Sequence, residues 1–293
     1  MAASREPDIK IPVTRSRVFA LTALAMTAFA ANSILCRAAL VRAGVDPTSF
    51  TLVRILSGAA TLWVIAATLR RGRRPGGSWL GALALFVYAA AFSVAYVTLP
   101  AGAGALLLFG AVQATMILVG VARGERPTPV QALGLLLALG GLAALVAPGV
   151  AAPPLVGSLL MLAAGVAWGA YSILGRGAGD PLLATTGNFL RAAPMAILFA
   201  APAAMAFRFA PGLVYALLSG ALASGIGYAV WYAALPGLSA TEGASVQLSV
   251  PVLAALAGAA LLGEPVTLRL ALASVAVLGG IAVVIVGKAR RSG

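Results

Sequence analysis

The chain has 293 residues, of which 61% are hydrophobic and 9% are charged. A soluble domain is about 45–50% apolar and about 25% charged, and it needs that charge to cover its surface. The composition therefore excludes a soluble protein and predicts that lipid is the solvent for much of the chain. The net charge of +13 does not indicate nucleic-acid binding, because the basic residues stand in short clusters between apolar runs.

The sequence lacks the residue types on which most catalytic and metal sites depend. It contains no histidine, and its single cysteine, Cys36, cannot form a disulfide within the chain. The two lysines, Lys10 and Lys288, both lie outside the apolar runs. No phosphate-binding loop and no pair of carboxylates is present. We therefore predict no enzyme activity, no catalytic residues, no metal site and no cofactor.

Ten apolar runs are long enough to cross a membrane, since about 20 residues span a hydrocarbon core of about 30 Å. The runs are longer and more continuous than the alternating strands of a β-barrel. They cover residues 18–41, 48–69, 78–98, 101–122, 128–147, 153–175, 182–207, 211–234, 239–262 and 266–287. The expected fold is an all-α integral membrane protein with ten transmembrane helices.

The distribution of lysine and arginine predicts the orientation of these spans. If the N-terminus is inside, 14 of the 20 Lys and Arg residues lie on the inner side, and two lie within spans. The outer side then holds Arg37, Arg42, Arg208 and Arg269. We expect both termini to be cytoplasmic, with residues 1–17 as a cytoplasmic tail.

A repeat at an offset of 139 residues divides the chain into two units, residues 18–148 and 153–287. Three motifs recur at that offset, Asn32-Ser-Ile-Leu-Cys-Arg37 as Tyr171-Ser-Ile-Leu-Gly-Arg176, Gly124-Glu125 as Gly263-Glu264, and Gly140-Gly141 as Gly279-Gly280. Each unit holds five spans, an odd number, so the second unit enters the membrane from the opposite side. Such an inverted-topology repeat is characteristic of alternating-access carriers. Duplication within a structural membrane protein is the alternative.

With these motifs the sequence resembles the drug/metabolite transporter superfamily, EamA type, over residues 18–287. The most specific of them are Gly124-Glu125-Arg126-Pro127 and Gly263-Glu264-Pro265, which follow spans four and nine. Within the superfamily the sequence resembles the bacterial aromatic amino acid exporters. The resemblance implies a bacterial inner-membrane protein with a central cavity lined by spans one, three, four, six, eight and nine. Spans five and ten would be peripheral.

Aromatic side chains deep in the spans are candidates for substrate contact, because they combine an apolar body with a polar tip. Tyr88 and Phe92 are four residues apart and share one helix face, and Trp168 and Tyr171 are three apart. Near span ends such residues can instead form the interfacial belt, which we expect for Tyr96 and Trp79. The candidate substrate-binding residues are Asn32, Tyr88, Phe92, Gln113, Trp168, Tyr171, Tyr228, Trp231 and Gln247.

Polar side chains within the spans need partners there. An unpaired amide in hydrocarbon costs several kcal/mol, so Gln113 and Gln247 must face a cavity or join two helices. Arg54 and Arg191 are functional candidates because they are charges inside the membrane. Each lies within reach of a span end, however, so we expect both to snorkel to the interface and to support the fold.

Small residues and prolines predict where spans pack closely or bend. Gly134–Ala138 and Ala276–Gly280 are small-xxx-small pairs, which let two membrane helices approach closely. Pro194 interrupts span seven, and Pro251 interrupts span nine.

Only one acidic residue, Glu242 at the start of span nine, lies near the expected pathway. We favour a helix-capping role for it over proton binding, because an acid is stabilised at a helix N-terminus. A carrier so poor in titratable groups is expected to move its substrate down the substrate's own gradient.

These features predict an alternating-access transporter that exports small neutral metabolites, foremost amino acids with aromatic or bulky apolar side chains. The first alternative is a broad-specificity efflux carrier for drugs or other metabolites. The second is a non-transporting scaffold or channel, although the spans contain few polar residues to line a channel. The expected partners are a small-molecule substrate and the lipid bilayer, with no nucleic acid and no prediction of oligomeric state.

Overall fold

The computed structural model describes residues 14–177, 179–202 and 211–292, and that part of the chain is helical without any strand. Within it, nine helices are long and apolar enough to cross a membrane, and the remaining predicted span is the 17-residue helix Trp79–Ala95. The predicted all-α architecture is therefore confirmed. Residues 1–13 of the expected tail, the end of the seventh run at Phe207, and Arg208 lie outside the described residues.

The first unit consists of α1 (Arg15–Arg37), a π-helical turn η1 (Ala38–Arg42), α2 (Pro47–Leu69), α3 (Trp79–Ala95), α4 (Ala101–Ala122) and α5 (Pro129–Val146). The second unit begins with α6 (Leu155–Leu174) and α7 (Pro181–Ala200). Its eighth span is α8 (Leu213–Leu218), the π-helical η3 (Ser219–Ile226) and α9 (Gly227–Ala234), followed by the short η4 (Leu235–Gly237). The ninth span is α10 (Ala240–Gln247) with α11 (Ser249–Leu262), and the tenth is α12 (Leu268–Ser292).

The second helix of each unit begins with the same device, an aspartate followed by a proline. Oδ1 of Asp46 accepts hydrogen bonds from the backbone N–H groups of Thr48 and Ser49, at 3.0 and 2.9 Å. Asp180 caps α7 in the same way and also pairs with Nε of Arg70 at 2.5 Å. Partial burial works against the charge of Asp180. The hydrogen bond and the charge of Arg70, together with the backbone N–H groups of Leu182 and Leu183, outweigh it and hold the pKa of the carboxyl below its ordinary value.

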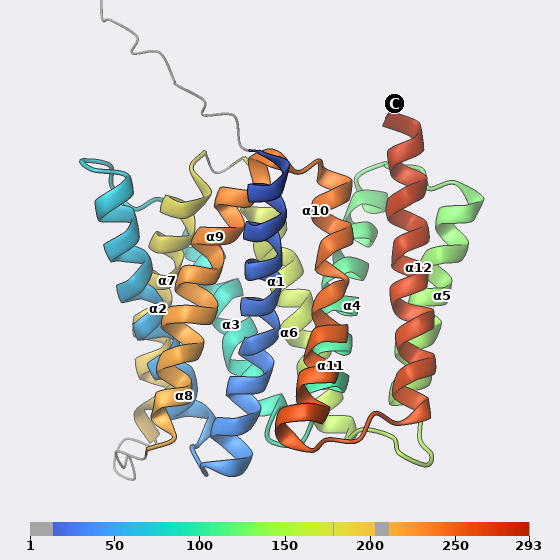
Figure 1. The fold of residues 1–293 in the computed structure, drawn as a ribbon, viewed down its shortest axis with the longest axis horizontal. Coiled ribbons are helices and arrows are strands. Elements are labelled where there is room, and N and C mark those ends of the chain that lie inside the picture. The colour runs from blue at the N-terminus through green and yellow to red at the C-terminus, as the bar shows by residue number, and fades with distance from the viewer. Residues whose placement is uncertain (1–13, 178, 203–210, 293) are drawn as a thin grey trace, which may run out of the picture.

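The helices form one bundle in which the start of α1 and the end of α12 lie at the same end (Figure 1). Helices of each unit pack against helices of the other unit. In the first direction α3 and α4 pack against α6, and in the second α9 and α11 pack against α1. Helices α5 and α12 pack chiefly against each other and lie together at one side of the bundle (Figure 1). Spans five and ten are therefore peripheral, as the family resemblance implied.

The contact between α5 and α12 is so close that glycine is required in it. A Cβ atom added at Gly134 would lie 2.7 Å from the backbone oxygen of Gly280. A Cβ atom added at Gly280 would meet the oxygen of Gly134 and lie 2.7 Å from the backbone nitrogen of Ala138. The predicted small-xxx-small pairs thus form this interface. The neighbouring Gly279 is different, since a Cβ atom there would meet nothing within 4 Å.

Replacing Gly280 with alanine should separate α5 from α12 and destabilise the protein by about 1–3 kcal/mol, the usual cost of overpacking. Gly279→Ala is the matched control, since it adds the same methyl group one residue away in open space. The apparent Tm of both purified variants in detergent measures the difference. Equal Tm values for the two variants would contradict this packing.

Candidate functional site

A cavity of about 430 Å³ lies within the bundle and is lined by α1, α4, α6, α7, α9 and α10. It reaches the end of the bundle where α6 finishes and α7 and α10 begin, because Arg176, Pro181 and Ser239 are part of its wall. We call this the open end. It is also the end at which α1 starts and α12 finishes (Figure 1).

Trp168 on α6 is the centre of the aromatic wall. Its ring stacks on Tyr88 with centroids 5.2 Å apart and contacts Phe109 edge-on at 5.2 Å. It also meets Phe29 edge-on at 6.3 Å, and Phe29 is the residue that corresponds to Trp168 in the first unit. Phe29 in turn contacts Tyr228 at 5.6 Å and Trp231 at 6.2 Å. The aromatic positions that the repeat relates therefore meet at the centre of the bundle.

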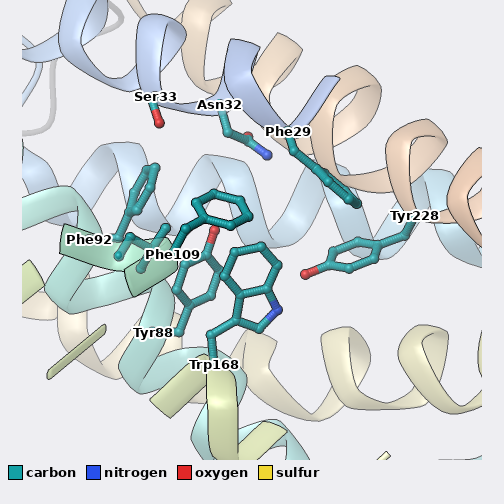
Figure 2. A pocket seen from close by; sticks show the side chains of 9 residues that line it. Phe29, Asn32, Ser33, Tyr88, Phe92, Phe109, Trp168 and Tyr228 are labelled. Atoms are coloured by element: carbon teal, nitrogen blue, oxygen red, sulfur yellow. The ribbon is translucent and has the colours of Figure 1, made fainter. Parts of the chain in front are cut away.

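A second, smaller pocket lies on the other side of these rings (Figure 2). Its volume of about 10 Å³ is roughly the space that one water molecule needs. It is lined by Phe29, Asn32, Ser33, Tyr88, Phe92, Leu108, Phe109, Trp168 and Tyr228. Phe29, Trp168 and Tyr228 line both spaces, so these three rings form the partition between the small pocket and the large cavity.

The polar groups of the large cavity come from facing helices. The hydroxyl of Tyr171 donates to Oγ1 of Thr185 at 3.0 Å, and Thr185 lies 2.6 Å from the hydroxyl of Tyr232. Gln113 on α4 is buried, and its Nε2 has no hydrogen-bond partner in the described part of the chain. A donor in that position is available to a molecule in the cavity.

Arg54 does not snorkel, so that expectation was wrong. Its side chain is 3% exposed and turns inward, where Nη2 donates to the hydroxyl of Tyr88 at 2.7 Å. The guanidinium carbon lies 5.1 Å from the ring centroid of Tyr88 and 4.7 Å from that of Phe92. Arg191 instead reaches the connection before α3, where its Nη1 donates to the carbonyl oxygen of Gly76 at 2.5 Å, and its role in supporting the fold stays a prediction.

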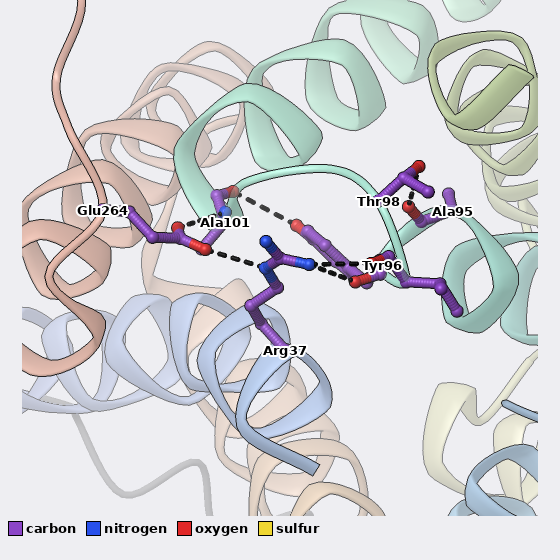
Figure 3. A network of polar contacts seen from close by, with 7 residues as sticks. Arg37, Ala95, Tyr96, Thr98, Ala101 and Glu264 are labelled. Atoms are coloured by element: carbon purple, nitrogen blue, oxygen red, sulfur yellow. Dashed lines mark hydrogen bonds and ion pairs between the residues drawn. The ribbon is translucent and has the colours of Figure 1, made fainter. Parts of the chain in front are cut away.

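The opposite end of the bundle, which we call the closed end, is held together by Arg37 and Glu264 (Figure 3). Nε of Arg37 donates to Oε1 of Glu264 at 2.8 Å, and Nη1 donates to the carbonyl oxygens of Tyr96 and Val97 at 3.0 and 2.9 Å. Oε2 of Glu264 accepts from the backbone N–H of Ala101 at 2.6 Å. One ion pair therefore joins the ends of α1, α3 and α11 to the start of α4.

Every candidate substrate-binding residue lies at one of the two spaces. Those in the wall of the large cavity are Gln113, Trp168, Tyr171, Tyr228, Trp231 and Gln247. Those in the wall of the small pocket are Asn32, Tyr88, Phe92, Trp168 and Tyr228. Their contact with a substrate stays a prediction. The expected set of lining helices differs from the structure in two respects. Helix α3 lines only the small pocket, and α7 contributes to the large cavity.

Tyr96 and Trp79, the two residues expected in the interfacial belt, lie in different surroundings. Tyr96 is not part of an interfacial belt, because it is fully buried, covers Gly104 and donates to the carbonyl oxygen of Ala101 at 3.2 Å. Trp79 is 62% exposed, as a belt residue should be. Glu242 caps α10, where Oε2 accepts from the backbone N–H of Ser239 at 2.8 Å.

The sequence analysis missed Thr185 and Asn188 on α7, which both line the large cavity. Neither is an aromatic residue or a glutamine, the residue types that make up the predicted set apart from Asn32. A usable signal was their spacing of three residues, which places both on one face of an otherwise apolar helix.

Residues 17–147 and 155–286 each match the EamA-like transporter family. The chain belongs to this family. EamA proteins are part of the drug/metabolite transporter superfamily, so the predicted superfamily is confirmed, and the chain is a multi-pass membrane protein with two EamA repeats. The family consists of transporters rather than enzymes.

Two comparisons extend along nearly the whole EamA chain. "Uncharacterized protein PA1977" of Pseudomonas aeruginosa is 60% identical over 286 residues, which cover 94% of this chain and 98% of that protein. A crystal structure of another protein, 22% identical, superposes with a TM-score of 0.63 and covers 95% of this chain and 99% of that one. The crystal structure shares the fold. The narrower resemblance to aromatic amino acid exporters stays a prediction.

Proposed function

We propose that this EamA protein is an alternating-access transporter that exports small neutral metabolites, foremost amino acids with aromatic or bulky apolar side chains. The observation that carries the proposal is the large cavity, which is open at one end of the bundle and closed at the other. Its volume of about 430 Å³ is in the range of small-molecule sites. Aromatic rings offer a surface for an apolar body, and Gln113, Tyr171 and Thr185 offer hydrogen bonds for a polar head.

The ion pair at the closed end supports a rocking motion of the two repeats. Arg176 lies just after the end of α6 and corresponds in the repeat to Arg37, the last residue of α1. Glu125 follows α4 as Glu264 follows α11. Arg176 lines the open end, where its Nη2 lies 4.0 Å from the sulfur of Met116. We expect Arg176 and Glu125 to join the helix ends around this mouth when the closed end opens, as Arg37 and Glu264 do in the present structure.

We further propose that the two units, 18–148 and 153–287, form an inverted repeat in a bacterial inner membrane with both termini in the cytoplasm. The odd number of spans per unit and the excess of arginine at the open end support this orientation. The open end would then face the cytoplasm, which is where an exporter collects its substrate.

A broad-specificity efflux carrier is the second candidate, and the composition of the cavity favours it. The wall includes six aromatic rings and the flexible Met116, and such surfaces adapt to ligands of different shape. A channel is disfavoured, because a channel needs a continuous polar path and the Arg37–Glu264 pair closes one end.

Since Glu242 caps α10, we expect transport without proton coupling. Accumulation of substrate driven by a pH gradient in proteoliposomes would contradict that expectation.

The proposed orientation predicts which thiols an impermeant reagent can reach. Cys36 is fully buried, so introduced cysteines react against a nearly silent background. A cysteine at Val150, which is 96% exposed at the closed end, should be labelled by an impermeant maleimide on intact cells. A cysteine at the exposed Thr14, at the open end, should be labelled only after permeabilisation. The reverse pattern would overturn the orientation.

Replacing Trp168 with alanine should lower counterflow of radiolabelled phenylalanine, tryptophan or leucine in proteoliposomes by at least about tenfold. The reason is that the ring contacts Phe29, Tyr88 and Phe109 and forms part of both linings, so its loss removes aromatic contact area and reshapes the site.

Trp63→Ala is the matched control for Trp168→Ala, because Trp63 is 53% exposed on the outer surface of α2. This control should transport like the wild type at equal amounts of reconstituted protein. Equal transport by the Trp168 and Trp63 variants would argue against the central cavity as the substrate site. A wild type that transports drugs but no amino acid would favour the second candidate.

A further inference from the structure

The small pocket lies beside a buried positive charge that no carboxylate neutralises. Arg54 has no acidic partner within the described part of the chain, and its Nη1 has neither solvent contact nor a hydrogen-bond partner there. Its neighbours are the hydroxyl of Tyr88 and the faces of Tyr88 and Phe92. Cation–π contacts offset only part of the cost of burying an ion, so the site favours an incoming negative group.

Tyr88, which contacts Arg54, and Asn32 both line the small pocket and present hydrogen-bond donors to it. The oxygen of the Tyr88 hydroxyl accepts from Arg54, which leaves the Tyr88 proton available for donation. Oδ1 of Asn32 accepts from Oγ of Ser219 at 2.7 Å, and Oγ of Ser224 lies within 3.5 Å. These bonds turn the amide so that its nitrogen points into the pocket (Figure 2). Among the described residues, no acidic side chain lines the pocket.

We propose that Arg54, Tyr88 and Asn32 form the carboxylate-binding subsite of the transporter. Donors from Tyr88 and Asn32 would bind the carboxylate oxygens, and Arg54 would supply the compensating charge. The body of the substrate would lie in the large cavity, on the other side of Phe29, Trp168 and Tyr228. The partition rings must shift for the carboxylate to enter, since the pocket is only about 10 Å³ in volume.

This inference rests on the proposed function and narrows its substrate class. The substrate must carry a carboxylate, as an amino acid does, whereas a lipophilic amine would bring a second positive charge close to Arg54. The expected structural role of Arg54 is kept, because its contacts also join α2 to α3. In addition, the buried positive charge of Arg54 would neutralise the carboxylate of the substrate.

Two pairs of ligands with the same body and opposite head groups test the proposal. The aromatic pair is 3-phenylpropionate and 2-phenylethylamine, and the aliphatic pair is 4-methylpentanoate and 3-methylbutylamine. Binding to the purified full-length protein is measured by isothermal titration calorimetry. The wild type should bind each carboxylate at least about tenfold more tightly than its amine. Arg54→Gln should weaken carboxylate binding at least about tenfold, because the buried carboxylate would lose its compensating charge, and should not weaken amine binding.

Arg191→Gln is the matched control, because it removes the other arginine within a span and should leave both affinities unchanged. If Arg54→Gln does not fold, Tyr88→Phe keeps the charge and removes one donor, and it should still lower carboxylate affinity selectively. The proposal is overturned if the wild type binds amines as tightly as carboxylates. It is equally overturned if a folded Arg54→Gln protein, or Tyr88→Phe in its place, keeps wild-type affinity for carboxylates.

The two ligand pairs separate failure of this inference from failure of the proposed function. Arg54-dependent binding of the aliphatic carboxylate alone would support the subsite and contradict the aromatic preference. Binding of phenylalanine without any preference for carboxylates would keep the proposed substrate and reject the subsite.

Discussion

Lipid cannot form hydrogen bonds with a polar side chain, and this constraint decides where the few polar groups of the bundle lie. Thr51 donates to Ser93 at 2.8 Å, and the hydroxyls of Tyr171, Thr185 and Tyr232 form one chain. At the closed end, Arg37 and Glu264 form an ion pair with each other and hydrogen bonds with nearby backbone groups. Two nitrogens stand apart from this pattern, Nη1 of Arg54 and Nε2 of Gln113, which are buried without a partner in the described structure. They lie beside the two central spaces, where a substrate can supply the hydrogen-bond acceptors that lipid lacks.

The same constraint makes the two ends of the bundle unequal. At the closed end one ion pair gathers four helix ends, and the rings of Phe92 and Tyr96 pack behind it with centroids 4.7 Å apart. At the open end the large cavity lies among α6, α7 and α10, and Arg70 and Asp180 tie α2 to α7 at the edge of the bundle. The repeat places an arginine and a glutamate at each end, Arg37 with Glu264 at the closed end and Arg176 with Glu125 at the open end. The proposed exchange of open and closed ends depends on this symmetry.

Hydropathy and the 139-residue repeat predicted the spans and the two units, because these depend on composition and spacing alone. The peripheral position of α5 and α12 was expected from the family resemblance. The shared helix face of Tyr88 and Phe92 was predictable for the same reason. The direction of Arg54 was not, because its distance from the span end permits snorkelling, and only the packing of α3 against α2 turns it inward. Tyr96 was misassigned because proximity to a span end does not reveal that Gly104 leaves space for its ring.

The central claim is that the two ends open alternately around one cavity, and double electron–electron resonance on the reconstituted protein tests it most directly. One pair of spin labels at Val97 and Val266 spans the closed end, and a second pair at Gly175 and Ser245 spans the open end, each in a Cys36→Ser background. We predict that addition of a transported substrate lengthens one distance while it shortens the other. Two distances that stay fixed under conditions of measured transport would contradict it.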